Sequence, residues 1–184
     1  MALAASNNFE KEKRAPNFTL LNVVTQKLET LEELKGEKGT VILFICNHCP
    51  FVIHINEAIV LIGNDYQKKG INFIAISSND IKNYPQDSPE KMKIIAKQLQ
   101  YPFPYLYDAT QKVAQAYNAS CTPDIYLFDK KLKIFYHGQL DESRPGNGIS
   151  VTGKDLKNAM DLLIQEKTYS QVQKPSIGCS IKWK

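Results

Sequence analysis

The sequence predicts an α/β domain with a mixed central sheet and helices on both faces. Three observations support this class: a continuous apolar run at Thr40–Ile45, a second at Ile71–Ser77, and apolar residues at helical spacing between the two. Runs of β-branched and aromatic residues are typical of strands buried on both faces. A strand, a helix and a strand in this order form a parallel unit with a right-handed crossover.

The elements around this unit follow from local patterns. Residues Pro16–Leu34 are expected to form an opening hairpin or loop, and Gly36–Gly39 a turn. The helix between the two strands is marked by Val52, Ile55, Ile59, Ile62 and Tyr66. Gly70 is its expected end, because glycine is favoured just past a helix C-terminus.

Helices and a hairpin are predicted further downstream. Ser88 followed by Pro89 is typical of a helix start, and the helical apolar spacing then continues to Leu99. Tyr101–Leu106 is expected to be extended, and Thr110–Tyr117 to be a short helix.

The last third of the chain adds an antiparallel hairpin and one helix. Ile125–Phe128 and Leu132–Tyr136 are predicted to pair across a short turn. Thr152 and Asp155 resemble a capping box that opens the last helix. We therefore expect a single domain over residues 1–184, with a core at about 14–165 and a tail of little periodicity at 167–184.

Composition and charge exclude several function classes. The chain has 184 residues, 43% hydrophobic and 23% charged, which suits one globular domain. Its net charge of +4 comes from scattered lysines, so we expect no nucleic-acid partner. The opening runs into the charged stretch Glu10–Arg14, which argues against a secretion signal.

The lengths of the apolar runs and the cysteine content bear on the compartment in which the protein works. The longest apolar run, Val41–Ile45, is too short to cross a bilayer. We therefore expect a cytoplasmic protein with no membrane partner. Structural disulfides are rare in that compartment, so the four cysteines are expected to serve catalysis, metal binding or burial.

The motif Cys46–Asn47–His48–Cys49 directly follows the first buried strand and precedes the helix. The free N–H groups and partial positive charge of a helix N-terminus favour a thiolate, which is the nucleophilic form of cysteine. Two intervening residues let a second thiol close a small disulfide ring. We predict that Cys46 attacks and Cys49 resolves, with no cofactor beyond this redox-active disulfide.

The residues beside the two cysteines extend this prediction. His48 is expected to stabilise the Cys46 thiolate, which would make the pair a better oxidant. Pro50 suits the first helical turn, where its missing N–H costs nothing.

Three motifs carry a family resemblance: Pro16–Asn17–Phe18–x–Leu20, the segment Val41–Cys49, and Thr122–Pro123. Over about residues 14–165, the chain resembles the thioredoxin superfamily, specifically the peroxiredoxin-like (AhpC/TSA-related) redoxins. The resemblance implies a thioredoxin-like fold with an N-terminal redoxin-type extension. It also implies that Pro123 is cis and faces the cysteine motif, with Thr122 offering backbone groups to a substrate segment.

The resemblance to true peroxiredoxins is weaker. At the two positions before Cys46 where peroxiredoxins carry Thr or Ser and Pro, this chain has Leu43 and Gly39. Arg144 is the only arginine downstream of the motif. Its loop is equally consistent with a surface turn.

Other residues have candidate roles at the same centre. Asn47, Cys121 and Arg144 are accessory candidates, although a single extra cysteine such as Cys121 is more often a buried apolar group. Cys179 is interpreted either as a second resolving thiol or as an anchor for the tail. His137 is interpreted either as an exposed residue or as a distant ligand.

Three functions are compatible with these features. We favour thiol–disulfide exchange through Cys46 and Cys49, with protein or small-molecule thiols and disulfides as substrates and an unidentified reductant. The first alternative is a thiol peroxidase and antioxidant protein that uses Cys46. The second is a copper or zinc module, for which the sequence places no histidine as a clear third ligand. No residue of the site is predicted to bind a metal.

Overall fold

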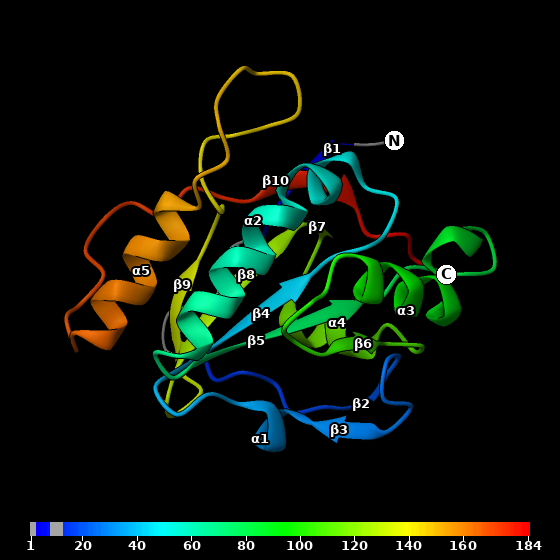
Figure 1. Cartoon of the computed structure of the whole chain (residues 1–184), viewed down its shortest axis with the longest axis horizontal. Coiled ribbons are helices and arrows are strands. Elements are labelled where there is room, and N and C mark those ends of the chain that lie inside the picture. The colour runs from blue at the N-terminus through cyan, green and yellow to red at the C-terminus, as the bar shows by residue number, and fades with distance from the viewer. Residues whose placement is uncertain (1–2, 8–12) are drawn as a thin grey trace.

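The computed structural model describes residues 3–7 and 13–184. Within them, seven strands form a mixed sheet in the order β3-β2-β6-β5-β4-β8-β9 (Figure 1). The strands are β2 (Thr19–Asn22), β3 (Leu28–Thr30), β4 (Gly39–Phe44), β5 (Ile71–Ser77), β6 (Tyr105–Tyr107), β8 (Asp124–Asp129) and β9 (Ile134–His137). Strand β5 pairs in parallel with β4 and β6, whereas β8 is antiparallel to β4 and β9. The predicted mixed sheet is confirmed.

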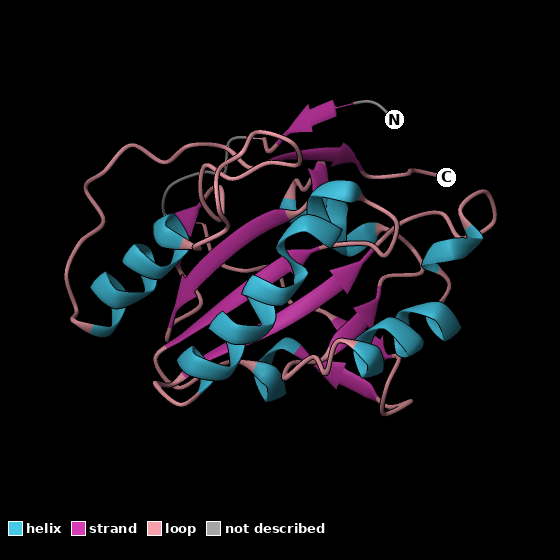
Figure 2. Cartoon of the chain, turned by 45° about the horizontal axis from the view of Figure 1, so that its top comes forward, coloured by secondary structure: helices cyan, strands magenta, loops and turns pink. Residues whose placement is uncertain are grey.

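Helices cover both faces of this sheet, as predicted (Figure 2). They are α1 (Leu31–Leu34), α2 (Pro50–Gln67), α3 (Pro89–Gln98), α4 (Lys112–Tyr117) and α5 (Lys154–Ile164), with a 3₁₀ turn at Pro85–Asp87. The alternation of β4 explains the two layers. Val41 and Leu43 pack in one cluster with residues of α2, α3 and α5. Ile42 and Phe44 pack in the other, with residues of α1 and α4.

Helix α2 follows the sequence prediction closely. Pro50 is its first residue and Val52, Ile55, Ile59 and Tyr66 are buried along one face. The helix ends at Gln67, and Gly70 follows with a φ of +87°, the left-handed conformation that glycine adopts without strain. Among the described residues, no helix is long and apolar enough to cross a membrane.

The predicted capping box at Thr152 and Asp155 is wrong. The N-cap of α5 is Gly153, whose side chain offers no acceptor. The N–H of Asp155, which the Thr152 side chain would cap, donates to the carbonyl of Leu140 at 3.2 Å, and the N–H of Leu156 donates to the same carbonyl at 3.3 Å. A backbone carbonyl outside the predicted box therefore caps the first turn, while the Asp141 carboxylate accepts from the preceding N–H groups of Thr152 and Gly153, each at 2.6 Å.

The C-terminal segment also differs from the expected tail. Residues Ile177–Ser180 form strand β10, which lies between β1 (Leu3–Ala5) and β7 (Cys121–Thr122) in a small antiparallel sheet. Its register places Cys179 opposite Thr122. With four residues, this strand is too short to show a clear alternation in the sequence. Its stability depends instead on partner strands far away in the chain. The charged stretch expected at 10–14 lies largely outside the described residues.

Candidate active site

The two motif cysteines lie at the junction of β4 and α2. Cys46 follows the buried end of β4, and Cys49 is the N-cap residue of α2, with Pro50 as the first helical residue. Both cysteines are buried, Cys46 at 2% exposure and Cys49 at 0%. All four cysteines of the chain lie in the described part, and none of them forms a disulfide.

Thr122 faces both thiols. Its hydroxyl lies 3.5 Å from the Cys46 sulfur, and its carbonyl oxygen accepts from the Cys49 thiol at 3.0 Å. The Thr122–Pro123 peptide bond is cis, as the family resemblance implied. The chain thus brings the predicted motif and the predicted proline segment together at one place.

The two thiols shift each other's pKa in opposite directions. Cys49 raises the pKa of Cys46, and burial and the nearby Asp87 carboxylate raise that pKa further. Cys46 lowers the pKa of Cys49 to about 5 against the effect of burial, assisted by the Cys179 thiol and by the backbone of Val52. Of the two thiols, Cys49 is therefore the one whose ionisation this site favours.

Two features of the structure oppose the low pKa that the motif predicts for Cys46. Cys49, rather than Cys46, occupies the N-cap, so it lies nearest the free N–H groups of α2. The carboxylate of Asp87 adds negative charge beside Cys46 and opposes its ionisation.

Asp87 anchors the residues between the two cysteines. Its fully buried carboxylate accepts from the backbone N–H of Asn47 at 2.8 Å, contacts Nδ1 of His48 at 2.7 Å, and accepts from the side chain of Asn79 at 2.8 Å. The Asn47 side chain is held as well, since it donates to the carbonyl of Gln86 at 2.9 Å. These bonds fix the loop relative to β5 and the 3₁₀ turn.

His48 lies closer to a possible ligand set than the sequence indicated. A ring nitrogen of His48, the Cys46 sulfur and a carboxylate oxygen of Asp87 lie within 4.8 Å of one another. The geometry supplies the third donor that the copper or zinc interpretation lacked. Asp87, however, already contacts three polar groups, and the His48 ring stacks on Tyr84 at 5.6 Å. The arrangement fits an anchored imidazole better than an open metal site.

The accessory candidates lie in different places. Arg144 donates to the backbone carbonyls of Asp141 and Ser143 and to the side chain of Gln139, so its guanidinium is committed to its own loop. The Cys121 thiol lies 3.5 Å from the carbonyl of Pro123, and burial raises its pKa. The structure does not join either side chain to Cys46.

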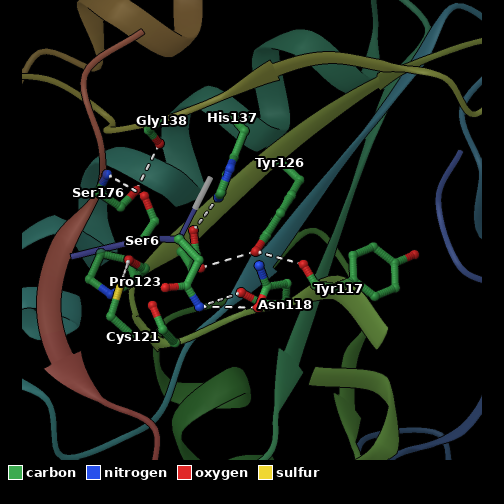
Figure 3. Close-up of polar contacts among 12 residues, drawn as sticks. Ser6, Tyr117, Asn118, Cys121, Pro123, Tyr126, His137, Gly138 and Ser176 are labelled. Carbon is green, nitrogen blue, oxygen red and sulfur yellow. Dashed lines mark hydrogen bonds and ion pairs between the residues drawn. The ribbon is translucent and has the colours of Figure 1, made fainter. Parts of the chain in front are cut away.

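A second buried Asp–His pair lies next to Pro123, between strands β8 and β9. Asp124 contacts Nε2 of His137 at 2.7 Å and accepts from the Tyr126 hydroxyl at 3.1 Å. Figure 3 shows His137 and Tyr126 side by side, near Pro123 and Cys121, and their rings stack at 4.0 Å. His137 is therefore neither exposed nor directed at the thiol pair.

Sequence reasoning missed Asp87 and the location of Cys179. Asp87 stands just before the helix start at Ser88, and nothing in its neighbours indicates a buried carboxylate. Cys179 lies opposite Thr122, whose carbonyl accepts from the Cys49 thiol, and Cys49 and Cys179 shift each other's pKa. Both placements depend on loops that only the folded chain brings to the motif.

A thioredoxin-like fold with paired thiols at a helix start, facing a cis-proline, defines a thioredoxin-superfamily redoxin. Residues 12–137 match the AhpC/TSA family, so the chain belongs to that family.

Solved structures agree with this assignment. An uncharacterized conserved protein from Geobacillus kaustophilus is 55% identical, with a TM-score of 0.98 over 100% of this chain and 97% of that one. A hypothetical protein from Sinorhizobium meliloti 1021 is 43% identical, with a TM-score of 0.95 over 98% of each chain. The thioredoxin domain of a thiol-disulfide oxidoreductase from Bacteroides vulgatus, 19% identical, has a TM-score of 0.65 over 85% of this chain and 99% of its own, and shows the fold alone. No curated protein matches the sequence.

Proposed function

We propose that the protein is a thiol–disulfide oxidoreductase that cycles between a Cys46/Cys49 dithiol and a Cys46–Cys49 disulfide. The observation that carries the proposal is the pair of buried thiols at the start of α2, both of which contact Thr122 beside the cis-proline. The lowered pKa of Cys49 favours a thiolate in this pair, and thiolate is the species that attacks a disulfide.

Cys46 is proposed as the thiol that meets the substrate. Its neighbours Asn47 and His48 are half-buried, whereas Cys49 lies behind the carbonyl of Thr122 and next to Cys179. Cys46 passes its proton to Cys49 and attacks the substrate disulfide as a thiolate. One substrate sulfur bonds to Cys46, and the other leaves as a thiolate that takes up the proton from Cys49. The Cys49 thiolate then attacks the Cys46 sulfur, so the Cys46–Cys49 bond forms and the second substrate sulfur leaves as a thiolate.

The roles of the surrounding residues follow from this cycle. Thr122 and Pro123 are proposed to receive the substrate segment, and Asp87 is proposed to position the motif loop. The substrates are proteins or small-molecule thiols and disulfides, and the cytoplasm is the proposed compartment. A separate reductant regenerates the dithiol, and no other cofactor takes part.

The test is the reduction potential of the pair, measured by equilibration with glutathione buffers followed by thiol trapping. We expect a single two-electron couple assigned to Cys46 and Cys49. Cys46→Ser should abolish catalytic reduction of insulin, while Cys121→Ser should keep most of it. A wild-type chain that forms no Cys46–Cys49 disulfide in any buffer would overturn the proposal.

A thiol peroxidase is the second candidate, favoured by the AhpC/TSA family match and by the Thr122 hydroxyl at 3.5 Å from the Cys46 sulfur. The commitment of Arg144 to its own loop argues against it. In a Cys49→Ser variant treated with dilute peroxide, a peroxidase would accumulate sulfenic acid on Cys46 much faster than free cysteine does. A rate equal to that of free cysteine removes this candidate.

A further inference from the structure

Strand β10 occupies the edge of the proline segment beside the thiol pair. Its residues Cys179 and Ser180 pair antiparallel with Thr122 and Cys121. Figure 1 shows the red strand β10 near the start of helix α2, and the two elements are in contact. The chain therefore places its own C-terminal strand where the proposed function places a substrate segment.

The fit between β10 and this segment is backbone against backbone. A Cβ added at Gly178 would lie 2.0 Å from the carbonyl oxygen of Thr122 and 3.0 Å from Cδ of Pro123. Real Cβ atoms do not come this close to a carbonyl, so only glycine allows β10 to approach. The close approach brings the next residue, Cys179, to the thiol pair.

Three thiols then lie close together. Cys46 and Cys49 shift each other's pKa, and so do Cys49 and Cys179. All three are buried in one cluster, Cys179 at 3% exposure. The carbonyl of Thr122, 3.0 Å from the Cys49 sulfur, belongs to the residue opposite Cys179 in the strand register.

We propose that Cys179 is a third redox thiol of the site and forms an alternative disulfide with Cys49. The Cys179 thiolate attacks the Cys49 sulfur of the Cys46–Cys49 disulfide. The Cys49–Cys179 bond forms, the Cys46–Cys49 bond breaks, and Cys46 leaves as a thiolate that takes up the proton given up by Cys179. The exchange involves no net oxidation.

This step has two consequences for the enzyme. The new disulfide ties β10 to the start of α2, so the C-terminal strand is fixed over the proline segment. Cys46 is released as a free thiol while the protein remains oxidised. The inference rests on the proposed oxidoreductase function, because that activity supplies the Cys46–Cys49 disulfide.

The test uses the full-length Cys46→Ser variant, equilibrated with glutathione disulfide and mapped by peptide mass spectrometry after thiol blocking. Glutathione disulfide first forms a mixed disulfide with Cys49, and Cys179 then displaces glutathione. We expect the Cys49–Cys179 disulfide to be the main oxidised product. Cys46→Ala should give the same product, and adding Cys121→Ser to either variant should leave it unchanged.

Two outcomes separate this inference from the proposed function. If glutathione remains attached to Cys49 in Cys46→Ser, or Cys49 and Cys179 remain reduced, the inference is wrong, while a Cys46–Cys49 disulfide in the wild type still supports the oxidoreductase. If the wild type forms no Cys46–Cys49 disulfide, the proposed function fails whatever the variant shows. In the wild type, Cys179→Ser should abolish the Cys49–Cys179 product and leave Cys46–Cys49 as the oxidised form.

Discussion

The protein contains two buried Asp–His pairs with the same contact distance in very different surroundings. Asp87 lies 2.7 Å from His48 at the motif loop, and Asp124 lies 2.7 Å from His137 between β8 and β9. Both carboxylates are fully buried, but the side chain of His48 is 16% exposed and that of His137 only 7%. The first pair joins two loops, while the second joins two paired strands.

The difference shows that an Asp–His pair can either affect thiol chemistry or stabilise the sheet, depending on its surroundings. At the motif, Asp87 also binds the backbone of Asn47 and places a negative charge near Cys46, so it affects thiol chemistry. Behind the proline, Asp124 contacts His137 and Tyr126, whose rings stack, so this pair stabilises the sheet. The predictions below test this division.

The largest expected effect is on stability. Asp124→Ala leaves His137 and Tyr126 without their buried carboxylate, and should lower the free energy of unfolding by about 3–5 kcal/mol. Asp87→Ala should cost less, about 1–3 kcal/mol, because the motif loop can admit water to the freed donors. Urea denaturation of both variants measures the two values. A larger loss for Asp87→Ala would contradict the division.

The next effect is on Cys46. In a Cys49→Ser background, Asp87→Asn removes the negative charge that raises the pKa of Cys46, so that pKa should fall by about one unit. The pH dependence of alkylation by iodoacetamide measures the shift. Asp124→Asn in the same background is the matched control and should change the profile much less. Equal shifts in the two variants would show that the charge of Asp87 has no specific role.

A pH dependence of stability is expected from Cys49. Its pKa falls from 9.0 to about 5 on folding, so between these values the unfolded chain holds a proton that the folded chain lacks. The stability from this group is present above pH 9 and is lost as pH falls through about 5. The raised pKa of Cys46 acts oppositely, since the unfolded chain loses that proton above its ordinary value of 9.0.

This dependence is checked by urea denaturation across the pH range. In the wild type, the thiol pair should make stability rise between about pH 5 and 9 and fall at higher pH. Cys49→Ser should lack the rise that is due to this pair. An identical profile in that variant would show that Cys49 is not ionised in the folded protein.

The smallest effect is expected at an exposed ion pair, which serves as a control for the two buried Asp–His pairs. Asp65 of α2 contacts Lys69, just past the end of that helix, at 2.7 Å on the surface, where water screens both charges. Asp65→Ala should leave the urea midpoint unchanged within measurement error. A loss comparable to that of Asp87→Ala would mean that burial is not what separates these pairs.

The sequence by itself determined the class of fold and the place of the motif. The apolar runs at Thr40–Ile45 and Ile71–Ser77 could be predicted as strands from the sequence alone, because strands buried on both faces need continuous apolar residues. Helix α2 was equally readable, since its buried face repeats at helical spacing and Pro50 begins it. The position of Cys46 and Cys49 at this strand–helix junction followed directly.

Only the tertiary structure decided the chemistry around the thiols. Asp87 reaches the motif from a loop after β5, and Cys179 reaches it on a strand whose partners, β1 and β7, lie far away in the chain. Local patterns do not encode such contacts, because hydrogen bonds and charge effects depend on distance in space. The motif alone therefore located the two cysteines but not the groups that shift the pKa of each.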